Sequence, residues 1–164
     1  MLKQTKEFLL FYLSPFVFWV ALIYYSSSQS FEDQTVEPLL AGGNLTWISD
    51  WFSWVSFYYG DTLVSLETRT TAEFAEFFIR KGAHLAVFGI LAILAFRLVY
   101  VVYRSNKTAV ISSLSFVLLY ASVDEFRQSL HPGRSGMVED VILNVVGGII
   151  ALPIFIWAKK RWRC

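Results

Sequence analysis

The sequence predicts an all-α, polytopic membrane protein with four transmembrane helices and an outer interfacial helical segment. Of its 164 residues, 55% are hydrophobic, 18% are aromatic and only 16% are charged. Soluble globular chains contain about 25% charged residues, so this chain has more apolar surface than one small soluble domain can bury. The net charge of +1 argues against a nucleic-acid partner, and the single cysteine, Cys164, excludes an internal disulfide framework.

Four apolar stretches are long enough to cross a bilayer, whose hydrocarbon core of roughly 30 Å needs about 20 helical residues. They run over residues 8–25, 83–103, 108–123 and 141–158. Polar or turn residues follow each stretch, which indicates separate spans within one domain covering residues 1–164.

The first stretch also resembles a signal peptide, because Lys3 and Lys6 precede it. Its apolar run is too long for that class of segment, and the residues that follow, Ser26 to Gln29, lack the small-x-small cleavage pattern. We therefore expect a helix that remains in the protein.

Basic residues at the span ends predict the orientation, because cytoplasmic loops are enriched in lysine and arginine. With both termini in the cytoplasm, nine basic residues near the span ends are cytoplasmic and five are outside. The cytoplasmic set is Lys3, Lys6, Arg97, Arg104, Lys107, Lys159, Lys160, Arg161 and Arg163, and the outer set is Arg69, Arg80, Lys81, Arg127 and Arg134. We therefore expect both termini to be cytoplasmic.

The outer segment, residues 26–81, has two parts of different composition. Residues 47–59 are rich in aromatic side chains with apolar positions near helical spacing. This pattern predicts a helix lying in the membrane interface, or a re-entrant piece packed on the bundle. Turns are expected at residues 42–44 and 59–61, where glycines stand beside asparagine or aspartate.

The last part of the outer segment carries the signals of a helix start. Thr70 followed by Glu73 forms a capping-box pattern, and Glu76 can pair with Arg80 four residues later. The helical pattern continues without interruption into the second span. We therefore expect one long helix that projects well beyond the lipid.

Ionisable side chains also occur near the outer ends of the second and third spans. Arg80 and His84 lie one turn apart at the head of the second span. The third span provides only about 24 Å of helix before Asp124 and Glu125, so these carboxylates are expected below the headgroup level. Polar groups at this depth are costly, which favours a functional role for them.

The last span presents a matching set. Asp140 and Asn144 lie one turn apart on one face, which predicts that they point to the bundle interior. Gly147 and Gly148 follow one turn deeper, where small residues permit close contact between helices. Three helices are thus expected to present polar groups at the same outer depth.

The connection between the third and fourth spans contains a candidate anion site. Residues 131–136 include a Pro-Gly turn, and Ser135 is a plausible N-cap for the last helix. A helix N-terminus beside the Arg134 guanidinium suits an anion. The alternative is that Arg134 only pairs with Glu139 or Asp140 and closes the loop.

Two segments resemble the signature segments of the VanZ-like family of small bacterial membrane proteins: RKGAHLAVFGIL, residues 80–91, and DEFRQSLHPGRSGMVEDVILNVVGG, residues 124–148. The SSSQS motif at residues 26–30 also matches, whereas residues 31–71 are not covered. The positions that match the family pattern are Arg80, Lys81, His84, Asp124, Glu125, Gln128, Arg134, Asp140, Asn144 and Gly148. One position departs: the family commonly has a histidine before the glutamine, and this chain has Arg127.

The resemblance implies a four-span protein of the bacterial cytoplasmic membrane. The namesake of the family reduces susceptibility to the glycopeptide teicoplanin without replacing the peptide target of the drug. The resemblance implies no reaction, so any chemistry must come from the residues themselves.

Two classes of function fit the residues, beside a purely structural role. A binding protein would recognise an anionic envelope component: a membrane lipid, a lipid-linked cell-wall precursor or the glycopeptide antibiotic. Its candidate ligand-binding residues are Arg80, Lys81, His84, Asp124, Glu125, Arg127, Gln128, Arg134, Asp140 and Asn144. A membrane-embedded enzyme would act on a lipid-linked substrate through His84, Glu125 and Asp140. No cofactor is expected, and a metal site using His84, His131 and carboxylates lacks recognisable ligand spacing.

Overall fold

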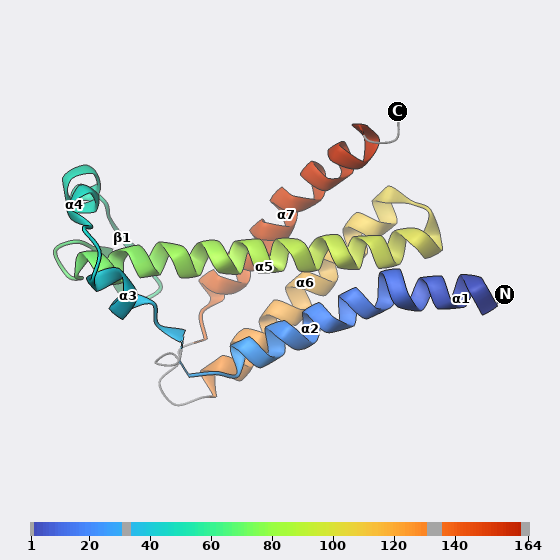
Figure 1. The fold of residues 1–164 in the computed structure, drawn as a ribbon, viewed down its shortest axis with the longest axis horizontal. Helices are drawn as coiled ribbons and strands as arrows, with labels where there is room; N and C mark the ends of the chain where they lie inside the picture. Colours follow the sequence, from blue (N-terminus) through green and yellow to red (C-terminus); the bar gives the residue numbers. More distant parts are fainter. Residues whose placement is uncertain (1, 31–33, 131–135, 162–164) are drawn as a thin grey trace.

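The computed structural model describes residues 2–30, 34–130 and 136–161. Its elements are α1 (Leu2–Phe8), the π-helical turn η1 (Leu9–Leu13), α2 (Ser14–Ser27), α3 (Glu37–Ala41), α4 (Thr46–Phe52), β1 (Ser56–Tyr59), β2 (Thr62–Ser65), α5 (Thr71–Tyr103), α6 (Asn106–Ser129) and α7 (Val138–Arg161). Within the described residues, four helical stretches are long and apolar enough to cross a membrane: Gln4–Ser27, α5, α6 and α7. The prediction of an all-α polytopic membrane protein is confirmed (Figure 1).

The central helix α5 begins and ends at clear local signals. Thr70 Oγ1 accepts a hydrogen bond from the Glu73 N–H (3.2 Å), and the Glu73 carboxylate accepts one from the Thr70 N–H (2.7 Å). The predicted capping box is therefore present. At the other end, Arg104 adopts a left-handed conformation (φ 54°), which stops the helix. The 33 residues of α5 extend about 50 Å, more than a bilayer core of roughly 30 Å requires.

The first span is irregular because of Pro15. In the π-helical turn before it, the Ser14 N–H donates to the Leu9 carbonyl, five residues earlier. Proline has no N–H, and its ring excludes a regular hydrogen bond to the carbonyl four residues earlier, that of Phe11. Arg97 Nη2 on α5 donates to this Phe11 carbonyl (3.3 Å), so the arginine within the second span stabilises the irregular turn.

The prediction of a continuous helix over residues 47–59 is wrong for its second half. Helix α4 ends at Phe52, and residues 56–59 form β1, which pairs antiparallel with β2. Gly60 (φ 57°) provides the expected turn between the strands. The hairpin buries Val64 against Phe74 of α5 together with Ile48 of α4. The strands bury apolar side chains on the projecting end of α5. This burial stabilises the hairpin more than a helix with the same aromatic residues would be stabilised.

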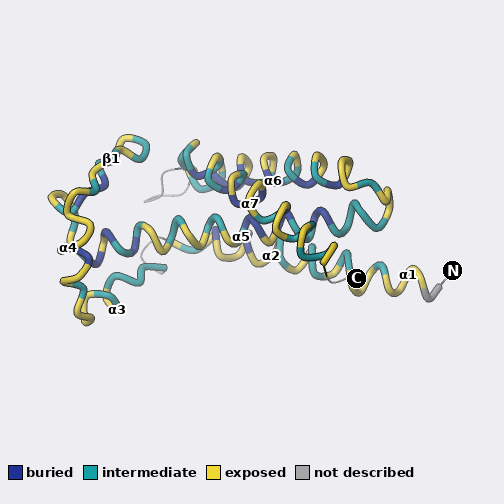
Figure 2. Tube along the Cα trace, turned by 90° about the horizontal axis from the view of Figure 1, so that it is seen from above, coloured by how far each residue is buried: buried dark blue, intermediate teal, exposed yellow. Residues whose placement is uncertain are grey.

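Helices α5, α6 and α7 form the core, and the first span lies at its edge (Figure 1). The buried core includes Phe88 and Phe96 of α5, Val117 of α6 and Leu152 of α7. In the apolar windows of α5 and α6, 33% of residues are buried, compared with 6% in the first span. Figure 2 shows the same contrast, with few buried positions along α1 and α2. The first span is therefore held by few apolar contacts.

Helix α7 approaches α5 closely at a glycine, as the sequence predicts. A Cβ atom added at Gly147 would overlap the backbone oxygen of Leu85 on α5. The approach is mutual, because a Cβ added at Gly89 would lie 3.1 Å from the Gly147 oxygen. This contact brings the polar residues one turn earlier on both helices into proximity.

Substitution of Gly147 by alanine should therefore destabilise the protein. The backbone of α5 must move to admit the methyl group, and overpacking of this kind costs about 1–3 kcal/mol or more. Gly82→Ala on α5 is the matched control, because a Cβ there meets nothing within 4 Å and should be neutral or stabilising by up to about 1 kcal/mol. Thermal unfolding in detergent, followed by circular dichroism, measures both. Equal melting temperatures for the two variants would contradict a close α5–α7 contact.

Candidate ligand-binding site

Two cavities lie side by side at the end of the bundle opposite the termini. The polar cavity (about 510 Å³) lies between the hairpin, α5 and the start of α7. Its charged lining residues are Glu37, Arg69, Glu73, Glu76, Arg80, Lys81 and Asp140. The apolar groove (about 290 Å³) lies between α2, α5 and α6. Its apolar lining residues are Leu22, Ile23, Val36, Ile79, Ala83, Val87 and Phe88. Arg80, His84 and Gln128 line both cavities.

An ion pair between Lys81 and Asp140 closes the floor of the polar cavity. Lys81 Nζ donates to both carboxylate oxygens of Asp140, at 2.5 and 2.8 Å. The Tyr59 hydroxyl donates to the same carboxylate, and Lys81 Nζ lies 4.3 Å from the centre of the Tyr59 ring. Burial and the hydrogen bond to Asp140 raise the pKa of Tyr59, which keeps the phenol neutral and donating. The hairpin, α5 and α7 thus meet at one carboxylate.

Glu76 connects α5 to the segment that follows the first span. Its side chain is buried and accepts hydrogen bonds from Thr35 Oγ1 (2.9 Å) and from the Val36 N–H (3.1 Å). Arg80 Nη1 lies 3.8 Å from Glu76 Oε1, which confirms the predicted pair four residues apart. At this distance the two side chains form an ion pair, but these two atoms are too far apart for a hydrogen bond.

The acids of the polar cavity are mostly compensated within the protein. Glu73 belongs to the capping box, Glu76 accepts from residues 35 and 36, and Asp140 accepts from Lys81 and Tyr59. The Arg69 guanidinium packs 5.2 Å from the centre of the Phe77 ring. Among the described residues it makes no hydrogen bond, so its N–H groups remain available to a ligand.

Glu37 is the exception among the acids. Its carboxylate lines the polar cavity and has no side-chain partner in the part of the chain that the structure describes. The cavity therefore combines an available guanidinium with one available carboxylate. A ligand that carries an anionic group near a neutral or cationic group suits this arrangement.

A buried polar layer, formed by His84, Glu125 and Asn144, lies beneath the cavity between α5, α6 and α7. Glu125 and Asn144 have relative exposures of 4% and 0%. Glu125 Oε2 accepts a hydrogen bond from the Met137 N–H (3.2 Å), just before α7 begins. Glu125 Oε1, His84 Nδ1 and both amide atoms of Asn144 have no hydrogen-bond partner among the described residues. Because such groups cost about 1–3 kcal/mol each when unpaired, the layer suits bound water or a polar ligand group.

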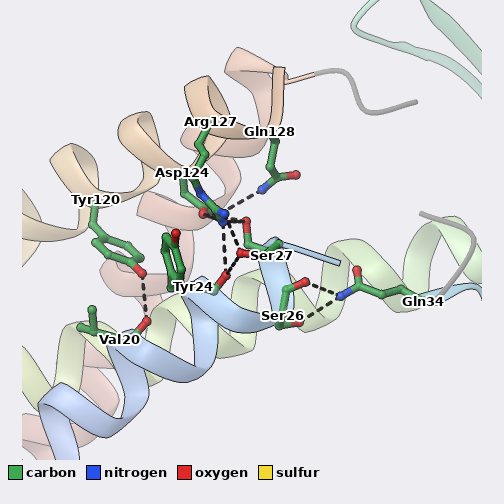
Figure 3. Close-up of polar contacts among 10 residues, drawn as sticks. Val20, Tyr24, Ser26, Ser27, Gln34, Tyr120, Asp124, Arg127 and Gln128 are labelled. Carbon is green, nitrogen blue, oxygen red and sulfur yellow. Dashed lines mark hydrogen bonds and ion pairs between the residues drawn. The ribbon is translucent and has the colours of Figure 1, made fainter. Parts of the chain in front are cut away.

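Asp124 and Arg127 form a clamp between α2 and α6, together with Ser27 and Ser28 (Figure 3). Ser27 Oγ donates to Asp124 Oδ1 (2.6 Å), and Arg127 donates to Ser28 Oγ (2.6 Å) and Ser27 Oγ (2.7 Å). Arg127 also lies 4.3 Å from the centre of the Tyr24 ring. Arg127 lines neither of the two cavities. At the position where the family commonly has histidine, this chain therefore has a residue that holds the first span.

The structure brings together most of the residues that the sequence singled out. Arg80, Lys81, His84, Gln128 and Asp140 line the polar cavity, Asp124 lines the groove, and Glu125 and Asn144 form the layer below. Arg134, the predicted N-cap Ser135 and His131 lie outside the described residues. Within the described ranges, no group of three or more His, Cys, Asp or Glu side chains is placed to hold a metal ion.

Sequence reasoning missed three contributors from the outer segment. In the sequence, Tyr59 has only an aromatic signal, Arg69 contributes only to the outer positive charge, and Thr35 has no signal. Each contributes through a contact with a distant part of the chain or the cavity wall, which local spacing does not reveal.

A double-mutant cycle on Lys81 and Asp140 tests whether this pair holds the site together. Lys81→Met and Asp140→Asn should each lower the free energy of unfolding by about 2–4 kcal/mol, because each leaves the partner charge poorly compensated in a mostly buried setting. The double variant should lose clearly less than the sum, since no unpaired charge remains. Chemical denaturation in detergent gives the three values. Additive losses would mean that the two side chains act independently.

Comparison with known proteins gives the family. The VanZ/LLP1 family model matches residues 10–159, nearly the whole chain, including all of α5 and α6 and most of the first and last candidate spans. No curated protein and no solved structure matches. The matched region contains both cavities, the buried polar layer and the α2–α6 clamp. The resemblance of the two signature segments thus extends to nearly the whole chain, which is a multi-pass membrane protein that belongs to the VanZ-like family.

Proposed function

We propose that this VanZ-like protein binds an anionic component of the bacterial cell envelope in the polar cavity and thereby modulates susceptibility to glycopeptides of the teicoplanin type. The observation that carries the proposal is the charge balance of the cavity. Glu73, Glu76 and Asp140 are compensated inside the protein, and Glu37 is the one acid of the cavity without a side-chain partner among the described residues. The Arg69 guanidinium packs on an aromatic ring and makes no hydrogen bond within the described residues.

A guanidinium in this setting favours phosphate or carboxylate. Its planar fork can donate two parallel hydrogen bonds to such a group, and aromatic stacking fixes its orientation in advance. Arg80 of α5 lines the same cavity. A membrane lipid, a lipid-linked cell-wall precursor and the glycopeptide itself all carry phosphate or carboxylate groups. Binding any of them would change how much of that molecule is available at the outer surface of the membrane.

The placement of the cavity supports an outward-facing site. Both termini lie at one end of the bundle, and α3, α4 and the hairpin lie at the other (Figure 1). The nine-to-five distribution of basic residues favours cytoplasmic termini. The polar cavity then opens at the outer face of the bacterial cytoplasmic membrane.

A membrane-embedded enzyme acting on a lipid-linked substrate is the second candidate. It is favoured by the buried atoms of His84 and Glu125 that lack partners among the described residues, because a general base needs an uncommitted nitrogen or oxygen. Asp140 is less suited, since Lys81 and Tyr59 already occupy its oxygens. Mass spectrometry of lipids and precursors with and without the protein separates the candidates, because only the enzyme produces a new covalent species.

Arg69→Gln should weaken the binding of glycerol phosphate to the purified protein by about tenfold to a hundredfold, as expected for the loss of charged hydrogen bonds. Glu37→Gln should strengthen it by about twofold to fivefold, because a repelling carboxylate is removed. Isothermal titration calorimetry in detergent measures both affinities. Arg161→Gln, which removes an exposed arginine at the opposite end of the bundle, is the matched control.

The same variants connect binding to the cell. In a host in which the intact chain raises teicoplanin resistance, Arg69→Gln should abolish the effect at unchanged membrane abundance, and Arg161→Gln should retain it. Equal behaviour of the two variants in both assays would refute the anion site.

The orientation is tested by cysteine labelling after Cys164→Ser. Asp61→Cys in the turn of the hairpin should react with a membrane-impermeant maleimide in intact cells, whereas Lys107→Cys in the first turn of α6 should react only after lysis. Both positions are exposed, so access to the reagent depends on the membrane alone. The reverse pattern would place the polar cavity in the cytoplasm.

A further inference from the structure

We propose, on the basis of the proposed function, that the ligand is a lipid phosphate that occupies both cavities at once. The phosphate lies in the polar cavity, and one hydrocarbon chain lies in the apolar groove. On this proposal the ligand of the anion site is an amphiphilic lipid that enters from the membrane.

The two cavities meet at a shared wall. Arg80, His84 and Gln128 line both of them, so only this wall of side chains separates the charged space from the apolar one. Arg80 and His84 are one turn apart on α5, and Gln128 faces them from α6. These three side chains lie where the junction between a phosphate headgroup and its chain would lie.

The groove combines apolar walls with a polar rim. Leu22 and Ile23 of α2 form one wall, and Ile79, Val87 and Phe88 of α5 form another. Ser27 and Asp124 at its polar rim are already bonded to each other (2.6 Å). Its volume of about 290 Å³ has room for roughly ten groups of about 30 Å³, the size of a water molecule or a methylene. One segment of a lipid chain fits along the apolar walls, with Arg80, His84 and Gln128 at the end nearest the headgroup.

Polar contacts fix the position of α2 beside this groove. Trp19 Nε1 donates to the Val87 carbonyl of α5 (3.0 Å), and Tyr120 donates to the Val20 carbonyl from α6 (3.0 Å). Two turns further on, the clamp of Ser27 and Arg127 holds the end of α2 (Figure 3). Helix α2 is thus attached at two levels by hydrogen bonds, and the groove lies between those levels.

The open side of the groove lies at the outer end of the first span. Leu22, within the first candidate span, has a relative exposure of 40%, and Ile79 on the opposite wall, in the projecting part of α5 just before the predicted second span, has one of 50%. A chain can therefore enter sideways from the bilayer while its phosphate reaches the polar cavity. This continuity with the charged site favours a lipid over a soluble phosphate or an apolar peptide.

Filling the groove tests the proposal independently of the anion site. Ala83 and Ala86 are both exposed on α5, but only Ala83 lines the groove. Ala83→Trp should weaken binding of dioleoyl phosphatidic acid, measured by native mass spectrometry, by at least about tenfold, and Ala86→Trp should leave it unchanged. Glycerol phosphate, which has no chain, should bind both variants as it binds the parent protein. Leu22→Trp fills the groove from α2 and replaces Ala83→Trp if the latter does not reach the membrane.

Each result has one meaning. Undiminished binding of phosphatidic acid to a folded groove-filled variant overturns the chain site, and so does equal affinity of the parent for phosphatidic acid and glycerol phosphate. Loss of glycerol phosphate binding in Arg69→Gln, together with either of these results, leaves the proposed anion site standing. If Arg69→Gln binds both ligands like the parent, the proposed function fails and the lipid site fails with it.

Discussion

The ion pair between Lys81 and Asp140 is the contact on which the candidate site depends. It joins the projecting part of α5 to the first turn of α7, and Tyr59 brings the hairpin to the same carboxylate. The pair forms because glycine at position 147 lets the two helices approach within backbone contact two turns deeper. A buried ion pair adds little net stability by itself, but an unpaired charge in its place is costly. The hairpin forms one wall of the polar cavity. Its position depends on the contact of Tyr59 with the Lys81–Asp140 pair, which tolerates little displacement.

The first span follows a different principle, because it is attached mainly by hydrogen bonds. Arg127 and Tyr120 of α6 donate to oxygens of α2, and Trp19 of α2 donates to the Val87 carbonyl of α5. Few apolar residues of α2 are buried. In a membrane such contacts are directional, whereas apolar contacts between helices compete with equally apolar lipid. A helix held in this way keeps its position without dense packing. The apolar groove beside α2 is a consequence of that arrangement.

The sequence predicts the features that depend on local spacing. Span positions, the capping box of Thr70 and Glu73, and the Glu76–Arg80 pair all follow from periodicity within a few residues, and all are present. The hairpin was missed because its strands are stabilised by covering Phe74, a contact that a local helical pattern does not register. The clamp role of Arg127 was missed for the same reason, since Ser28 lies 99 residues earlier in the chain. Burial of Asp140 and Asn144 was predictable because a membrane penalises any other orientation.

The hydrogen-bond partners of the acids show which carboxylates support the fold and which atoms remain open. Asp140 is saturated by Lys81 and Tyr59, and one oxygen of Glu125 caps the start of α7, so these carboxylates serve the fold first. What remains uncommitted in the buried layer is one oxygen of Glu125, the His84 Nδ1 atom and the Asn144 amide. These atoms can solvate a bound polar group. The proposed anion site needs only the Arg69 guanidinium and these open polar atoms.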